Sequence, residues 1–126
     1  MKYKNILLID DDVDDQDIFK TAVGDITDDV NCIALTSGAE ALLKLEAKLI
    51  IPDVIFLDLN MPVMSGQQFL VEIKASERLM QIPVIIFSTS SYPATITMMK
   101  NLGAHDFITK PNKFDKLVEI LTPFLS

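Results

Sequence analysis

Five short runs with strand-like composition recur along the chain, and each is followed by a segment with helical periodicity. The runs occupy residues 6–9, 31–36, 54–57, 84–87 and, more weakly, 106–109. Most are continuously apolar or β-branched rather than alternating, which is typical of strands buried on both faces of a parallel sheet. Repeated strand–helix units predict an α/β fold: a doubly wound, five-stranded parallel sheet with helices on both faces and right-handed crossovers.

Helix start and stop signals separate the runs. Ser37 and Ser65 are each followed three residues later by Glu or Gln, the pattern of a capping box. The other predicted boundaries are Gly24 ending the first helix, Pro93 in the first turn of the fourth, Gly103 ending the fourth, and Asn112 capping the fifth. No linker or internal repeat interrupts this order.

Composition limits the classes of function. The chain has 126 residues, 49% of them hydrophobic, which suits one domain with one good core. A formal net charge of -7 repels phosphate backbones, so direct nucleic-acid binding is not expected. No apolar run approaches the roughly 20 residues of a membrane span. Cys32 is the only cysteine, which excludes an intrachain disulfide and fits a reducing, cytoplasmic location.

Polar residues follow four of the five predicted strands. They are Asp10, Asp11 and Asp12 after the first, Asp58 and Asn60 after the third, Ser88 and Thr89 after the fourth, and Lys110 and Pro111 after the fifth. In open α/β sheets, ligands bind beyond the carboxyl ends of the strands, so these residues are expected to converge. Asp14, Asp15 and Asp17 are interpreted as a solvated stretch or as charges that favour a helix N-terminus.

The converging groups indicate phosphoryl chemistry on a carboxylate. Clustered carboxylates repel one another unless a cation joins them, and Mg²⁺ prefers such oxygen ligands. A remaining carboxylate can act as a nucleophile and form an acyl phosphate. Metal and lysine would neutralise the phosphoryl charge, and a serine would supply a hydrogen bond.

The whole chain resembles the receiver domain of bacterial two-component response regulators. The resemblance is carried by ILLIDDD at 6–12, VIFLDLNMP at 54–62 followed by Gly66, PVIIFS at 83–88, and FITKP at 107–111. It implies a flavodoxin-like strand order 2-1-3-4-5 and a single receiver domain over residues 1–126 with no output domain.

The resemblance also implies a role for each site residue. Asp58 is the phospho-acceptor, Asp11 binds Mg²⁺ directly, Asp10 acts through metal-bound water, and Asp58 and the Asn60 backbone carbonyl complete the protein ligands. Lys110 contacts the phosphoryl group, Ser88 and Phe107 form a switch pair, Pro111 is structural with a preceding bond that is commonly cis, and Asp12 is a bystander. A plain core role for Phe107 stays open, because Phe lacks the hydroxyl of the more familiar Tyr.

The implied activity is signalling rather than enzymatic, apart from catalysis of the protein's own phosphorylation and dephosphorylation. The expected partners are a sensor histidine kinase or a histidine phosphotransfer protein, together with a downstream protein target that the sequence does not identify.

Three alternatives are weighed against this interpretation. A flavodoxin-like electron carrier is disfavoured, since the carboxylates after the first strand would repel a bound phosphate. An aspartyl-phosphate hydrolase resembles this pattern but has a second Asp where this chain has Asn60. A degenerate receiver that binds partners without phosphorylation is the remaining alternative, since fold alone does not guarantee activity.

Overall fold

The computed structural model describes residues 3–126 as five strand–helix units in one open sheet. All strand pairs are parallel, and their order is β2-β1-β3-β4-β5, as predicted. The elements are β1 (Asn5–Ile9), α1 (Val13–Ile26), β2 (Asn31–Leu35), α2 (Gly38–Glu46), β3 (Val54–Leu57), α3 (Gly66–Lys74), β4 (Val84–Ser88), α4 (Pro93–Asn101), β5 (Asp106–Thr109) and α5 (Phe114–Leu125).

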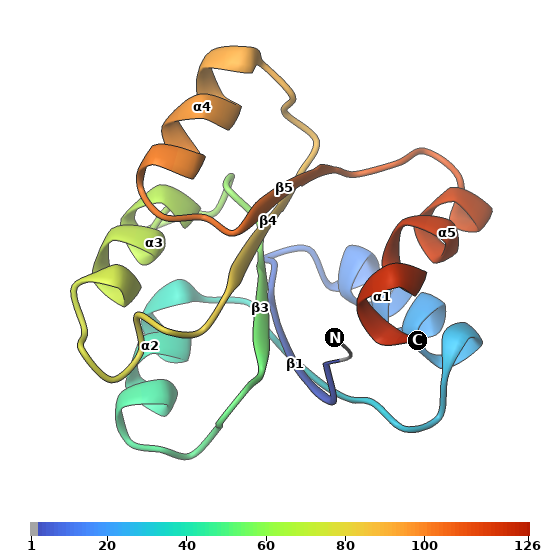
Figure 1. Ribbon diagram of the computed structural model, residues 1–126, viewed down its shortest axis with the longest axis horizontal. Coiled ribbons are helices and arrows are strands. Elements are labelled where there is room, and N and C mark those ends of the chain that lie inside the picture. Colours follow the sequence, from blue (N-terminus) through green and yellow to red (C-terminus); the bar gives the residue numbers. More distant parts are fainter. Residues whose placement is uncertain (1–2) are drawn as a thin grey trace.

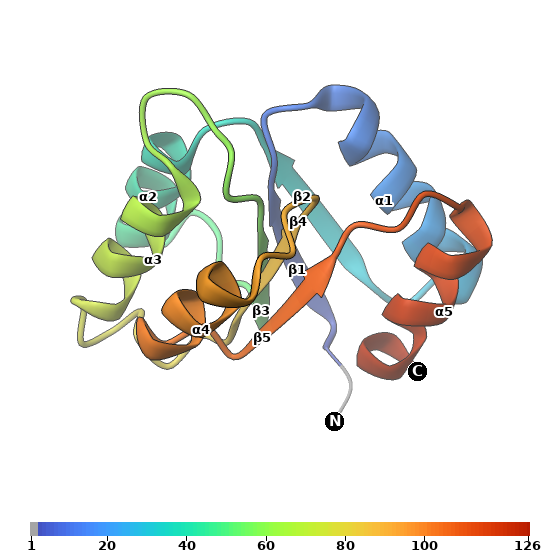
Figure 2. The same cartoon turned by 90° about the horizontal axis from the view of Figure 1, so that it is seen from above.

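Helices cover both faces of the sheet, which explains the continuous apolar runs. Figures 1 and 2 show α2, α3 and α4 on one side of the strands and α1 and α5 on the other. Successive strand side chains point to opposite faces. Along β1, Leu7 and Ile9 join the core under α2, α3 and α4, whereas Ile6 and Leu8 join the core under α1 and α5. The sheet therefore separates two apolar cores.

Two predicted helix boundaries are wrong. Gly24 lies inside α1, which continues to Ile26 and ends at Thr27 in an extended conformation. A glycine costs a helix only about 1 kcal/mol, so apolar packing of the last turn outweighs it. At the other end of the chain Lys113, not Asn112, is the N-cap of α5, and it makes no side-chain capping bond.

The third helix begins as the sequence predicts. Ser65 and Gln68 form a full capping box, each side chain accepting from the other residue's backbone N–H. At Ser37 only half of the box forms, with the Ser37 hydroxyl accepting from the Glu40 N–H. Both predicted signals of the fourth helix agree with the structure. Pro93 is the first residue of α4, and Gly103, just after the C-cap of α4, has the positive φ of +109° that favours glycine.

Across residues 3–126, every helix is too short or too polar to traverse a bilayer.

Candidate functional site: an acidic cluster at the carboxyl edge of the sheet

Three carboxylates meet where β1 and β3 end. One oxygen from each of Asp10, Asp11 and Asp58 lies within 4.8 Å of the others. Asp10 and Asp58 are buried, at 1% and 7% exposure, while Asp11 is exposed to solvent. The structure therefore brings together the three carboxylates that the sequence assigns to a metal site.

Backbone hydrogen bonds fix the two strand ends beside one another. The Asp58 N–H donates to the Ile9 carbonyl at 2.9 Å, and the Asp10 N–H donates to the Leu35 carbonyl at 3.0 Å. Both acidic residues thus extend the ladder one position beyond their strands, so the rigid sheet rather than a loop sets their spacing.

The turn after Asp10 is held from two directions. The Asp12 N–H donates to the Asp10 carboxylate at 2.9 Å, and the buried Gln16 side chain donates to the Asp10 carbonyl at 2.8 Å. Asp12 itself caps α1 by accepting from the N–H groups of Asp14 and Asp15. Asp12, predicted to be a bystander, therefore has a structural role, and Gln16 is a site-supporting residue that the sequence analysis missed.

Lys110 reaches the cluster from the end of β5. Its Nζ lies 2.8 Å from Asp10, 3.0 Å from Asp15 and 3.9 Å from Asp58. The same ammonium sits 5.5 Å from the centroid of the Phe87 ring, within range of a cation–π interaction. The lysine is thus hydrogen-bonded to two carboxylates and stands beside Asp58 without a hydrogen bond to it.

Asp15 contacts the site, which the sequence does not predict. The sequence interprets Asp15 as part of a solvated stretch or as a charge that favours a helix N-terminus; it lies in the first turn of α1, and it also pairs directly with Lys110. Helical side chains lean toward the helix N-terminus, so a residue in the first turn of α1 points back to the strand edge.

Burial and charge shift the ionisation of two site residues. Burial, with smaller contributions from Asp10 and Asp11, raises the pKa of Asp58 from 3.8 to about 6 against the opposing effect of Lys110. Burial acts to lower the pKa of Lys110, but hydrogen bonds to Asp10 and Asp15 outweigh it and leave that pKa raised. The cluster therefore carries excess negative charge around a fixed ammonium.

The donor set fits Mg²⁺. The three carboxylates offer hard oxygen ligands from two strands, and the exposed Asp11 leaves the cluster open to water, which Mg²⁺ retains when it binds proteins. Asn60 follows Asp58 closely, its N–H 3.5 Å from the Asp58 carboxylate. A divalent cation here would relieve the repulsion from Asp10 and Asp11, which adds to the effect of burial in raising the Asp58 pKa.

Gly66 packs against the loop that follows β3. A Cβ at this position would lie 2.8 Å from the Leu59 Cα and closer still to the Asp58 carbonyl oxygen. The Gly66 N–H also donates to the Leu59 carbonyl at 3.0 Å. The start of α3 is therefore pressed against the backbone of Asp58, a contact that only glycine permits.

The remaining predicted residues lie on β4 and β5. Leu57 on β3 pairs with Ile86 on β4. Asp58 comes one residue after Leu57 and Ser88 two residues after Ile86, so both lie at the carboxyl ends of neighbouring strands. Ser88 is fully buried, and its hydroxyl accepts from the Ser90 N–H at 3.3 Å. Phe107 is half-buried against the core under α4.

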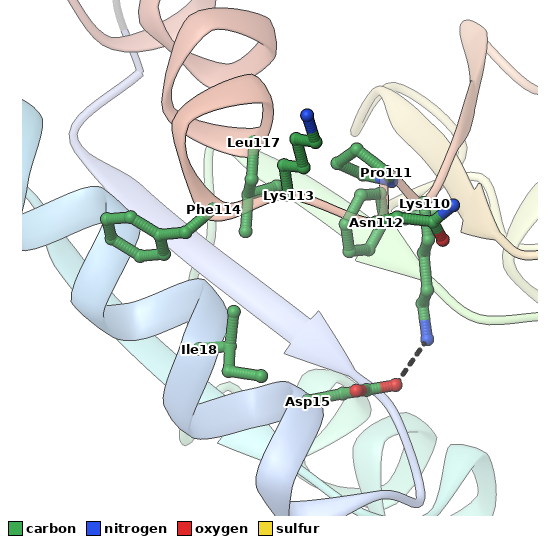
Figure 3. Close-up of a pocket in the computed structure, with 9 residues that line it drawn as sticks. Asp15, Ile18, Lys110, Pro111, Asn112, Lys113, Phe114 and Leu117 are labelled. Carbon is green, nitrogen blue, oxygen red and sulfur yellow. Dashed lines mark hydrogen bonds and ion pairs between the residues drawn. The ribbon is translucent and has the colours of Figure 1, made fainter.

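The peptide bond between Lys110 and Pro111 is trans, in contrast to the cis bond that the family resemblance suggested. Trans is the favoured isomer of an X–Pro bond by about 0.5–1 kcal/mol, and here the chain reaches α5 without departing from it. Pro111 instead lines a pocket of about 300 Å³ between α1 and the loop that precedes α5 (Figure 3). Ile18, Phe114 and Leu117 line the same pocket.

Comparison with known proteins places this geometry among signalling proteins. The response regulator receiver domain family matches residues 6–122. A protein-glutamate methylesterase/protein-glutamine glutaminase of Treponema denticola is 42% identical over 106 residues, or 79% of this chain. The chain spans only 27% of that relative's length. The two-component response regulator ORR13 of rice (Oryza sativa subsp. japonica) is 33% identical over 96% of this chain and 98% of its own length.

A solved structure agrees in fold over nearly the whole chain. The phosphorylated cyanobacterial phytochrome response regulator RcpA superposes with a TM-score of 0.87 at 31% identity. The match covers 96% of this chain and 90% of the other. The similar proteins thus come from bacteria and from a plant, so similarity does not restrict the source to bacteria.

Proposed function

Because the chain belongs to the response regulator receiver domain family, we propose that it accepts a phosphoryl group on Asp58 in a Mg²⁺-dependent reaction. The observation that carries the proposal is the convergence of three carboxylates within 4.8 Å, with Lys110 3.9 Å from Asp58. The phosphorylated state of the similar regulator RcpA supports it.

The reaction is an attack by the Asp58 carboxylate on phosphorus. A carboxylate oxygen forms a new O–P bond, the bond from phosphorus to the donor breaks, and the donor atom leaves with the electron pair and takes a proton from solvent. Donors of this kind are a phosphohistidine on a kinase or phosphotransfer protein, or a small acyl phosphate. Asp58 becomes an acyl phosphate and its buried carboxylate charge moves outward onto the phosphoryl oxygens.

The surrounding residues supply charge rather than covalent chemistry. Asp10 and Asp11 would hold Mg²⁺ with Asp58 and the Asn60 backbone, and the metal would supply electrostatic stabilisation of the transferring phosphoryl oxygens. Lys110 lies close enough to donate to the same oxygens once they extend from Asp58.

We further propose that the phosphoryl group changes partner binding through Ser88 and Phe107. Ser88 presents a buried hydroxyl at the end of β4, and Phe107 lies on β5 opposite Ile86. A serine that turns toward the phosphoryl group would vacate space beside the β5 aromatic ring, and α4 would respond. A downstream protein would then distinguish the two arrangements.

Intact mass after incubation with acetyl phosphate tests the proposal. We expect one phosphoryl adduct with Mg²⁺, and none after removal of the metal with EDTA or in Asp58→Asn. Asp28→Asn removes an exposed carboxylate on the loop between α1 and β2 and should leave the adduct unchanged. An adduct that survives Asp58→Asn refutes the assignment of the acceptor. If the wild type forms no adduct, a phosphorylation-independent binding module becomes the better description.

A further inference from the structure

The ion pair between Asp15 and Lys110 joins α1 to the end of β5 (Figure 3). Asp58 lies 3.9 Å from the same ammonium. A lysine ammonium has three N–H donors. Two are directed to Asp10 and Asp15, at 2.8 and 3.0 Å, while Asp58 at 3.9 Å is beyond hydrogen-bond distance. In the unphosphorylated protein the cation is therefore held on the α1 side of the site.

The Asp15 carboxylate is positioned by a rigid turn. The Asp15 N–H donates to the Asp12 carboxylate at 3.2 Å, and the next residue, Gln16, is buried with its side chain on the Asp10 carbonyl. Lys110 is anchored as well, since its N–H donates to the Ser88 carbonyl at 2.8 Å and its side chain is only 11% exposed. Both partners come from fixed backbone, so the pair is a property of the folded site.

We propose that Asp15 is a positioning residue that competes with the phosphoryl group on Asp58 for the Lys110 ammonium. The inference rests on the proposed function of Asp58. Phosphorylation adds negative charge at Asp58, and the fixed charge of Asp15 both repels that group and holds the cation that would neutralise it. The same charge favours binding of a divalent cation, so Asp15 acts in opposite directions on the metal and on the phosphoryl group.

This opposition gives a signature that a structural role does not produce. Asp15→Asn should bind Mg²⁺ about five-fold more weakly and, at saturating Mg²⁺, bind beryllofluoride about five-fold more tightly than the wild type. This magnitude corresponds to the upper end for a partly exposed ion pair. Beryllofluoride serves as the probe because it occupies the phosphoryl position without covalent chemistry, and isothermal titration calorimetry gives both affinities.

Asp14→Asn is the matched control. Asp14 carries the same charge in the same turn of α1, is exposed, and is not among the carboxylates within 4.0 Å of the Lys110 ammonium. Its two affinities should stay within about two-fold of the wild type, since an exposed charge without a close partner contributes little. Asp15→Glu retains the carboxylate and should also remain within about two-fold. Asp15→Ser provides a second charge-removing variant if Asp15→Asn does not fold.

Several outcomes overturn the inference. Equal shifts in Asp14→Asn and Asp15→Asn would show an effect of net charge, and parallel loss of both affinities in Asp15→Asn would show structural damage. Unchanged affinities would show that Lys110 is not restrained by Asp15. If the wild type itself binds no beryllofluoride, the proposed function fails and this inference fails with it. If the wild type binds beryllofluoride and Asp15→Asn binds it equally well, only this inference is refuted.

Discussion

Replacing Asp58 with Asn should stabilise the metal-free protein, and more so as the pH rises. Asp58 is 7% exposed, and burial with its acidic neighbours raises the pKa of its carboxyl from 3.8 to about 6. At 1.36 kcal/mol for each pH unit, this shift corresponds to about 3 kcal/mol. The folded protein holds the Asp58 proton more tightly than the unfolded chain does. Asp58 therefore costs no stability below pH 3.8, and its penalty grows until the pH has passed about 6.

The assay is urea unfolding in EDTA at pH 4.5 and pH 8, for the wild type and Asp58→Asn. Of the destabilisation of about 3 kcal/mol caused by the Asp58 charge, about 2 kcal/mol should develop between these two pH values. The free energy of unfolding of Asp58→Asn, relative to the wild type, should thus rise by about 2 kcal/mol from the lower to the higher pH. Asp28→Asn, which removes an exposed carboxylate, should show no comparable change.

Two results would refute the reasoning. A stability difference between Asp58→Asn and the wild type that is independent of pH would show that the Asp58 carboxyl ionises normally. A difference that shrinks toward pH 8 would mean that Lys110 stabilises the carboxylate more than burial penalises it. Adding Mg²⁺ at pH 8 should stabilise the wild type more than Asp58→Asn, because the cation offsets the buried charge of the Asp58 carboxylate, which the variant lacks.

Two substitutions test the packing around the site. Gly66→Ala should destabilise the fold by about 1–3 kcal/mol in urea unfolding, since its Cβ would press on the Leu59 backbone. Gly24→Ala is the control, because a Cβ there meets no atom within 4 Å, and it should stabilise α1 by about 0.5–1 kcal/mol. If both substitutions changed the free energy of unfolding equally, the close approach of Gly66 to Leu59 would not be the cause. Phe19→Ala should cost about 3–5 kcal/mol, because the ring lies 5.1 and 5.6 Å from two neighbouring phenylalanine rings. Ile18 is half-exposed, so Ile18→Ala should lower the free energy of unfolding clearly less. A similar loss in both variants would contradict the assignment of Phe19 to the core.

The sheet could be predicted because its signal is local. Continuous apolar runs and capping patterns lie within a few residues, and they identified five strands and the start of α3 at Ser65. The convergence of Asp10, Asp58 and Lys110 followed from topology, since parallel strands present their carboxyl ends at one edge.

Other features depend on contacts that the sequence does not express locally. Whether Gly24 ends a helix depends on tertiary packing of the turn that follows it. Asp15 and Phe87 join the site only because Lys110 crosses from β5 between α1 and β4. The Asp15–Lys110 pair joins residues 95 apart in the sequence, and the residue types of one segment do not reveal a contact with another segment.

The separation of the two cores by the sheet has a consequence for how such a protein can diversify. Each apolar strand side chain belongs to one core only, so a substitution beneath α1 and α5 removes no contact from the core beneath α2, α3 and α4. Effects at distant sites without shared partners usually add. One helical face can then accumulate changes that suit a new partner, while the other face and the acidic edge between them keep their geometry. In this fold, the surfaces available for recognition can evolve or be engineered independently of one another.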